Sequence, residues 1–215
     1  FYYITKLNDI IKISLTKGND LMKLPAALKY SHLLLRQVIR PGDNVIDATM
    51  GNGNDTAFLA KLVGTNGNVY SFDIQKQALT NTKSRLKNAN LTRPVTLYQI
   101  GHQHILDTIG MTNIKGVIFN LGYLPGGDKR IVTRARSTIQ ALKQCLMLLQ
   151  LGGVIILVLY YGPLNDPKEK AAVIHFASQL NQKKYSVLQY QFINQIHEPP
   201  ILIAIQRINW FKFLF

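Results

Sequence analysis

The sequence predicts a doubly wound α/β fold with seven strands, because strand-length apolar runs alternate with stretches of helical periodicity along most of the chain. Two further observations support this fold: a glycine-rich turn follows the first apolar run, and an acidic residue follows the second. Such alternation produces a mostly parallel sheet with right-handed crossovers and helices on both faces. A chain of 215 residues has room for one such domain and little else.

The expected elements follow one another from residue 26 to residue 208. Apolar residues recur at helical spacing over Ala26–Ile39, and Pro41-Gly42 ends that helix. Other helices are expected after the glycine turn up to 63 and at 75–90, 103–109, 132–151 and 168–181. Strands are expected at 44–49, 69–74, 95–100, 116–120, 153–160, 186–194 and 201–208. No helix lies between the last two strands, which are separated by a segment with Pro199-Pro200, so a hairpin there would make the last strand antiparallel.

The two ends of the chain differ in composition from this pattern. Residues 1–21 are rich in Ile, Lys, Asn and Tyr, whereas Met22 opens a segment that resembles an ordinary start. We therefore expect the domain to cover 22–208, with 1–21 as a non-native or flexible extension and 209–215 as a tail. The alternative is a genuine N-terminal helix that packs on the domain.

Composition and charge narrow the class of protein. No apolar run reaches the roughly 18 residues that span a bilayer, and no secretory signal is evident. The single cysteine, Cys145, excludes a disulfide framework or a cysteine zinc cluster within one chain; it is expected in the core and fits a cytoplasmic protein. The net charge of +14 favours a polyanionic partner such as nucleic acid, although charge alone does not distinguish RNA, DNA and an anionic membrane. A merely solubilising surface is the alternative.

The strongest local motif is the turn between the first strand and the next helix, Asp47–Thr56. Gly51 and Gly53 permit a tight turn and a close approach of a ligand to the backbone. The helix N-terminus presents N–H groups to a carboxylate, and Asp47 could pair with an ammonium group. The expected ligand contacts in this turn are Asp47, Gly51, Asn52, Asn54, Asp55 and Thr56. For Asp55 a simple helix cap is the alternative.

A carboxylate at the end of the second strand identifies the ligand more closely. Asp73 can accept hydrogen bonds from a ribose diol, which fits both NAD and S-adenosylmethionine (SAM). The turn reads G-N-G-N-D and lacks the G-x-G-x-x-G pattern of a pyrophosphate loop, which favours SAM. Gln75 is then expected near the ribose or adenine, and Gly101 and His102 near the adenine edge. With His102 and His104 as the nearby histidines, we expect no metal site.

A second motif, Asn120–Lys129, leaves the fourth strand and should face the same crevice. Its first four residues resemble the Asn-Pro-Pro-Tyr tetrad of methyltransferases that modify exocyclic amines, with both prolines replaced here. In that tetrad the polar side chain holds the amine and the aromatic ring stacks on the base. An ordinary glycine-rich loop is the alternative.

Cationic residues follow this motif. Arg130 and Arg134 lie four apart and could share a helix face. We expect them, with Lys129, to contact RNA phosphates. The alternative is a solvated charged face.

With these motifs, the chain from about Met22 to Ile208 is similar to a family of bacterial methyltransferases, formerly labelled "putative rRNA methylases", that are associated with tRNA wobble-uridine modification. The resemblance rests on Asp47–Thr56, Phe72–Gln75, Asn120–Lys129, Ser137–Ile139 and Phe192–Gln195 with Pro199-Pro200. One departure is Gly162-Pro163, where family members usually carry Gly-His after the fifth strand.

The resemblance implies a class I SAM-dependent methyltransferase with a Rossmann-like, seven-stranded sheet. The implied reaction converts 5-aminomethyluridine, or its 2-thio form, at position 34 in the tRNA anticodon stem-loop to 5-methylaminomethyluridine. An in-line displacement by a neutral amine needs mainly proximity and orientation from the protein. Asn120 would orient the amine, Asp128 would act as general base and Tyr123 would stack on uracil. Asn194 and Gln195 would touch the nucleotide from another strand end.

Several alternatives stay open at this point. The substrate could be rRNA or a small molecule, although the basic charge argues against the latter. A non-catalytic RNA-binding protein with a SAM-type fold is disfavoured by intact Asp73 and Asn120, and an NAD oxidoreductase by the turn pattern. The oligomeric state is open, with a homodimer among the options.

Overall fold

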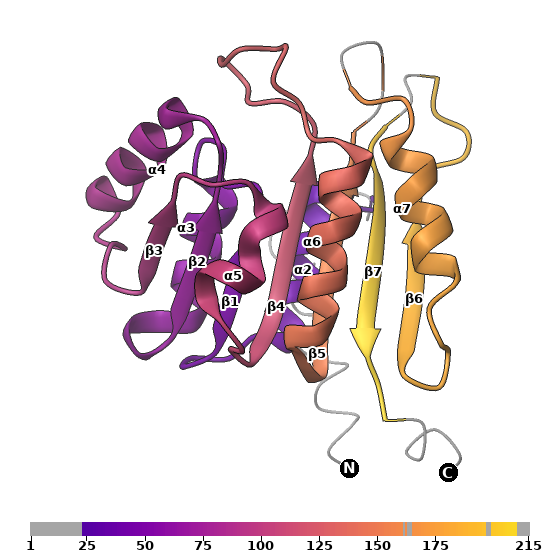
Figure 1. Ribbon diagram of the computed structural model, residues 1–215, viewed down its shortest axis with the longest axis horizontal. Helices are drawn as coiled ribbons and strands as arrows, with labels where there is room; N and C mark the ends of the chain where they lie inside the picture. The colour runs from indigo at the N-terminus through magenta and orange to yellow at the C-terminus, as the bar shows by residue number, and fades with distance from the viewer. Residues whose placement is uncertain (1–22, 161, 163–164, 197–198, 210–215) are drawn as a thin grey trace.

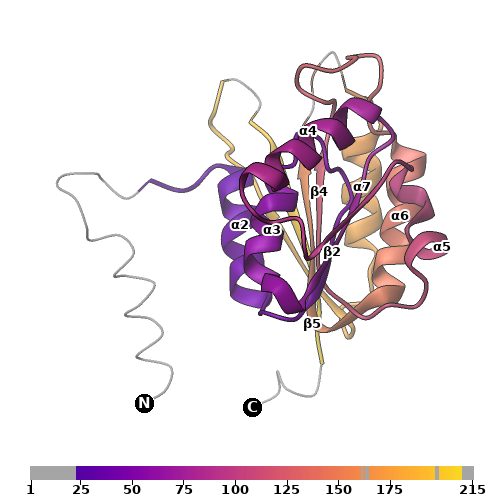
Figure 2. The same cartoon turned by 90° about the vertical axis from the view of Figure 1, so that its left-hand side faces the viewer.

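The computed structural model describes residues 23–160, 162, 165–196 and 199–209, which form a sheet between two layers of helices (Figures 1 and 2). The strands span Asn44–Asp47 (β1), Asn68–Phe72 (β2), Val95–Tyr98 (β3), Ile114–Leu121 (β4), Leu149–Leu159 (β5), Tyr185–Tyr190 (β6) and Ile201–Arg207 (β7). The α-helices span Ala27–Val38 (α2), Asn54–Val63 (α3), Lys76–Asn88 (α4), Ile105–Ile109 (α5), Ala135–Leu148 (α6) and Glu169–Ser178 (α7). Short 3-10 helices span Gly64–Asn66 (η1) and His102–His104 (η2).

The seven strands lie in the order β3-β2-β1-β4-β5-β7-β6. Neighbours from β3 through β5 pair in parallel, whereas β7 pairs antiparallel with both β5 and β6. This confirms the predicted doubly wound sheet with an antiparallel last strand. The strand order reverses between β1 and β4, so the carboxyl ends of these two strands border the crevice where such sheets bind ligands.

Apolar side chains fill both faces of the sheet. On one face α2 and α3 cover a cluster that includes Leu35, Leu59 and Ile118. On the other face α5, α6 and α7 cover a second cluster that includes Phe119 and Cys145, and Figure 2 shows the two helical layers edge-on. Cys145 is fully buried, as expected of a core residue. In β4 successive side chains alternate between the two clusters, which explains why this central strand is apolar almost throughout.

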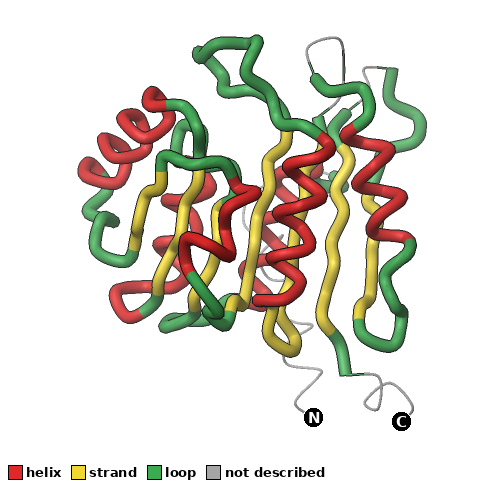
Figure 3. The backbone as a smooth tube through the Cα atoms, in the orientation of Figure 1, coloured by secondary structure: helices red, strands yellow, loops and turns green. Residues whose placement is uncertain are grey.

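Several element boundaries differ from the sequence prediction. The helix expected from 132 begins at Ala135, because Val132 forms an isolated antiparallel bridge with Tyr123. The same helix ends at Leu148, since β5 begins directly afterwards and accommodates Gly152 with a φ of +72°. The strand expected to reach 194 ends at Tyr190. β4 and β5 end at the same edge of the sheet because they pair in parallel, and Figure 3 shows the loop after β4 extending from that edge.

The predicted division of the termini falls mostly outside the described residues. Residues 1–22 and 210–215 are not described, and of the expected tail only Asn209 is. Within the described part, no helix is long and apolar enough to cross a membrane.

Candidate cofactor and substrate site

The turn after β1 is built around two glycines in the left-handed region. Gly51 has a φ of +52° and Gly53 a φ of +76°, conformations that side chains rarely adopt. A β-carbon on Gly53 would lie 2.8–2.9 Å from three atoms of Thr82 in α4. Gly53 is also the N-cap of α3, and no side chain caps that helix. The first turn of α3 therefore keeps N–H groups for an anionic ligand.

Asp47 and Thr56 lie beneath this turn and brace it. The Asp47 carboxylate accepts a hydrogen bond from the Thr56 hydroxyl at 2.6 Å and from the Thr49 N–H at 3.2 Å. Both Asp47 and Thr56 are fully buried. Burial, with nearby Asp55, raises the pKa of Asp47 to about 7. The expectation that Asp47 pairs directly with an ammonium group does not fit this placement, because the Asp47 side chain is fully buried beneath the turn.

Asp73 ties the end of β2 to the turn after β1. Its two carboxylate oxygens accept hydrogen bonds from the N–H groups of Gly51 at 3.0 Å and Gln75 at 2.9 Å. An ionised carboxylate has about four acceptor positions, so oxygen lone pairs remain for a ribose diol. Partial burial raises the pKa of Asp73 above its ordinary value. Gln75 follows as the N-cap of α4.

Asn52 links the turn to the loop after β4. Its side-chain amide donates to the carbonyl of Pro125 at 3.1 Å and accepts from Asn81 at 2.8 Å, while its own carbonyl accepts from Arg85 at 2.7 Å. Asn54, the first residue of α3, is exposed. The sequence motifs 47–56 and 120–129 are thus in direct contact.

His102 follows β3 and carries a buried acceptor without a donor. Its Nδ1 lies 3.1 Å from the Ala48 carbonyl, which only accepts, so Nδ1 carries the hydrogen and Nε2 keeps its lone pair. Nε2 has no hydrogen-bond partner among the described residues, and burial lowers the pKa of His102 to about 4. A neutral imidazole acceptor suits a donor such as the exocyclic amine of adenine. Gly101, also buried, packs beside Gln103.

Together these features fit SAM. The glycine turn allows close approach, the uncapped α3 N-terminus suits a carboxylate, Asp73 suits the ribose, and His102 offers an acceptor for an amine. No cluster of metal-ligating side chains occurs in the described part of the chain.

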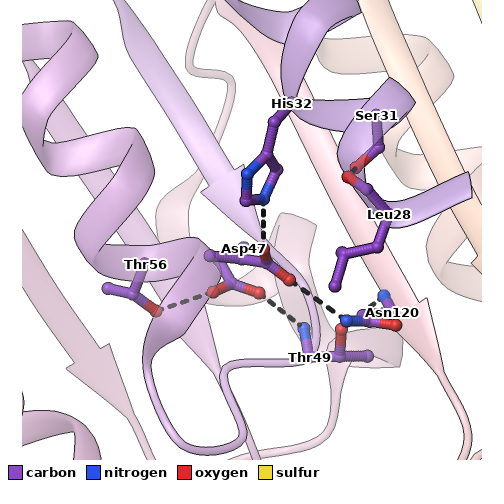
Figure 4. Close-up of polar contacts among 8 residues, drawn as sticks. Leu28, Ser31, His32, Asp47, Thr49, Thr56 and Asn120 are labelled. Carbon is purple, nitrogen blue, oxygen red and sulfur yellow. Dashed lines mark hydrogen bonds and ion pairs between the residues drawn. The ribbon is translucent and has the colours of Figure 1, made fainter. Parts of the chain in front are cut away.

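Asn120, near the carboxyl end of β4, joins a hydrogen-bonded chain of side chains (Figure 4). Its N–H donates to the Thr49 hydroxyl at 2.7 Å, and its side-chain Nδ2 donates to Asp55 Oδ2 at 3.2 Å. The other Asp55 oxygen lies 2.6 Å from Nε2 of His32 on α2. Asp55 is therefore not a helix cap, since Gly53 is the N-cap of α3 and no side chain caps that helix; instead it connects three elements at the sheet edge.

The loop after Asn120 holds the other predicted substrate residues. Tyr123 is 37% exposed and free to present its ring. Asp128 and Arg130 form an ion pair at 2.7 Å, and this arginine lowers the pKa of Asp128 to about 2. Lys129 and Arg134 are exposed. The prediction that Arg130 and Arg134 share a helix face is wrong, because α6 begins only after Arg134, whose backbone is extended.

Asn194 and Gln195 are exposed in the segment after β6. Because β6 and β5 each pair antiparallel with β7, both carboxyl ends point to the edge that carries Asn120. In the described part of the chain, no hydrogen bond or ion pair joins these two residues to the turn or to Asn120, so their contact with the nucleotide stays a prediction.

Three residues at this edge were not predicted: His32, Thr49 and Tyr160. His32 bonds Asp55 from 23 residues away and Thr49 bonds Asn120 from 71 away, so no local spacing reveals either contact. Tyr160 follows β5; burial and nearby Asp55 raise its pKa. For Tyr160, the one signal in the sequence was an aromatic residue at the carboxyl end of a predicted strand, where ligands bind in such sheets.

Comparisons with known proteins agree with this geometry. A family model described as "Putative rRNA methylase" matches residues 69–206, and one described as protein-L-isoaspartate(D-aspartate) O-methyltransferase matches residues 19–104. The chain is 37% identical over 192 residues to the chloroplastic tRNA (mnm(5)s(2)U34)-methyltransferase of Arabidopsis thaliana. The matched region covers 85% of this chain and 70% of that protein.

Solved structures show the same similarity. A "putative rRNA-methylase" from Clostridium thermocellum is 47% identical with a TM-score of 0.84, over 87% of this chain and 100% of that one. A structure described as "a putative methyltransferase" from Streptococcus mutans in complex with SAH is 40% identical with a TM-score of 0.79, over 86% of this chain and 99% of that one. A SAM-dependent O-methyltransferase from Thermotoga maritima shares the fold at 14% identity and a TM-score of 0.61, over 94% and 71%.

Proposed function

Because this chain belongs to the family described as "Putative rRNA methylase" and is a SAM-dependent methyltransferase, we propose that it methylates the wobble nucleoside of tRNA. The proposed substrate is the amine of 5-aminomethyluridine, or of its 2-thio form, at position 34. The Arabidopsis relative's name, which specifies mnm(5)s(2)U34, supports this choice. The observation that carries it is Asn120, whose side chain lies in a hydrogen-bonded chain between the cofactor turn and an exposed tyrosine loop.

The residues that would hold SAM surround the β1 turn. Asp73 would accept from the ribose hydroxyls, the N–H groups of Asn54, Asp55 and Thr56 would face the carboxylate, and His102 would accept from the adenine amine. Asp47 acts from beneath by holding the backbone of the turn. When bound, SAM would supply an electrophilic methyl carbon on its sulfonium sulfur for transfer to the amine nitrogen, with S-adenosylhomocysteine as the leaving group.

The protein's part in this transfer is orientation of the amine. Asn120 would hold the amine beside the cofactor, and Tyr123 would stack on the uracil ring, a contact worth about 1–3 kcal/mol. Asp128, expected as the general base, is a poor candidate because its ion pair with Arg130 leaves a pKa of about 2. A base this weak takes up almost no proton at neutral pH. We therefore assign Asp128 to holding the loop rather than to proton removal.

Exposed cations on the same loop would contact the RNA backbone. Lys129, which lies between the paired Asp128 and Arg130 in the sequence, and Arg134 are both exposed. Because Asp128 partly neutralises the charge of Arg130, Arg130 should contribute less to phosphate binding than Lys129 or Arg134. The net charge of +14 is consistent with a polyanionic substrate.

The test is single-turnover methyl transfer from SAM to tRNA carrying 5-aminomethyluridine, with nucleosides identified by mass spectrometry. We expect 5-methylaminomethyluridine to form in the presence of the protein, and no product with the matched tRNA that carries unmodified uridine at position 34. Transfer to rRNA but not to this tRNA would favour the rRNA alternative. Binding of tRNA without transfer to either RNA would favour a non-catalytic role.

A further inference from the structure

We infer that His32 and Asp55 are positioning residues that fix the orientation of the Asn120 side-chain amide, so that its Oδ1 faces the substrate amine. The inference rests on the proposed function, since it states which end of the Asn120 amide faces the substrate amine. It starts from one connected set of contacts: His32 Nε2 to Asp55 Oδ1 at 2.6 Å, and Asp55 Oδ2 to Asn120 Nδ2 at 3.2 Å (Figure 4).

The polarity of this chain follows from the chemistry of its central member. An ionised carboxylate only accepts hydrogen bonds, so both neighbours of Asp55 must donate to it. Asn120 can donate only through Nδ2, and its Oδ1 must therefore point away from Asp55. His32 must likewise carry a hydrogen on Nε2. The hydrogen bond to Asp55 thus determines which end of the Asn120 amide is the nitrogen and which is the oxygen.

His32 holds Asp55 in a fixed position. Its ring stacks on Phe58 of α3, with the ring centroids 3.9 Å apart and the ring planes 5° apart. The guanidinium carbon Cζ of Arg36 lies 5.6 Å from the centroid of the same Phe58 ring. The Asp55 side chain is 7% exposed and that of His32 is 28% exposed. Through His32, α2 thereby contributes a hydrogen-bond donor to Asp55 in the first turn of α3. The other titratable groups that face Asp55 are Asp47 and Tyr160.

The orientation matters for the reaction because an amine nitrogen has one lone pair. When Oδ1 accepts a hydrogen from the amine, the lone pair stays available for the methyl group. If the amide were turned, Nδ2 would donate to that lone pair and compete with the methyl group for it. The positive charge that develops on nitrogen during attack also favours a carbonyl oxygen over an N–H group at this place.

The decisive experiment exchanges the polarity of the pair. In Asp55→Asn, the new Oδ1 accepts from His32, its Nδ2 faces residue 120, and the Asn120 amide must turn. We expect kcat for methylation of 5-aminomethyluridine tRNA to fall on the order of 100-fold, with SAM affinity by calorimetry nearly unchanged. Adding Asn120→Asp restores an acceptor toward the amine, because a carboxylate can accept from Asn at 55 and from the substrate. The double variant should regain about tenfold of the lost kcat.

His32 provides a second, independent test. His32→Gln can keep a nitrogen donor toward Asp55, whereas His32→Leu cannot, so kcat should be higher in the Gln variant while melting temperatures match. The matched control is His104→Leu, because His104 also faces an aspartate, Asp107, but at 3.8 Å on the outside of α5. This control should leave kcat unchanged.

Two outcomes would overturn the inference while the proposed function stands: a wild-type kcat in Asp55→Asn, or a double variant no more active than Asp55→Asn. If Asp55→Asn instead weakens SAM binding at unchanged kcat, Asp55 is a cofactor residue and the inference is wrong. Should the wild-type protein transfer no methyl group, the proposed function fails. The inference is then judged by NMR of the Asn120 side-chain amide, which must shift in His32→Leu and not in His104→Leu.

Discussion

Single aspartates at the sheet edge differ in their roles because they differ in burial and in their partners. Asp47 is enclosed and bonded within the protein, Asp73 is partly buried with acceptor positions left, and Asp128 is half-buried and paired with the exposed Arg130. The sequence placed all three at strand ends or loops but could not rank their burial. Burial depends on which elements pack above a side chain, and that is settled only by tertiary contacts.

Asp47 should make stability depend on pH. Its folded pKa of about 7 lies above its ordinary value of 3.8, so the folded state holds this proton more tightly. Its contribution to stability is complete below pH about 4 and is lost as pH rises to about 7, at a cost on the order of 4 kcal/mol. We expect Asp47→Asn to gain stability relative to the wild type between pH 5 and pH 8. Urea unfolding at both pH values, without SAM, measures this; parallel pH profiles for the two proteins would contradict it.

At the level of elements, periodicity identified most strands and helices because the pattern of apolar residues is local. The alternation of α2 through β5 was predicted for this reason. The start of α6 was not, since the bridge between Tyr123 and Val132 joins residues across a loop and withdraws residues 132–134 from the helix. The His32–Asp55 contact escaped prediction for the same reason: it depends on how α2 packs on α3.

The glycine turn offers an element-level prediction with an internal control. Gly53→Ala places a methyl group against Thr82 at a φ of +76°, whereas Gly42→Ala has a φ of +90° with nothing within 4 Å. Both substitutions should cost about 1–2 kcal/mol in backbone strain. Only Gly53→Ala should add a further ~1–3 kcal/mol from overpacking and weaken SAM binding, because α4 and the turn must separate. Denaturant unfolding and calorimetry of the two variants measure the difference. Equal losses of stability would show that Thr82 moves aside freely.

At the scale of the whole molecule, the edge of the sheet at which a cationic side chain lies decides whether it can contact RNA bound at the site. The net charge of +14 indicates a polyanionic partner but not a face. The carboxyl edge of the sheet carries Asn120, Tyr123 and the loop with Lys129 and Arg134. Arg93 precedes β3 and is therefore at the opposite, amino edge, although it is equally exposed. RNA bound at the site should be close to the first group and remote from Arg93.

Salt dependence of tRNA binding separates these two edges. A phosphate contact releases counterions, so removing one lowers the slope of log affinity against log salt by about one. We expect Arg134→Ala to lower the slope by about one and Arg93→Ala to leave it unchanged, although both remove one positive charge. Arg130→Ala should have the smaller effect of the two loop variants, because Asp128 already neutralises that guanidinium at 2.7 Å. Titrations of wild type and variants with tRNA at several salt concentrations give the slopes. An equal fall for Arg134→Ala and Arg93→Ala would mean that the RNA responds to the overall charge and does not lie along the carboxyl edge.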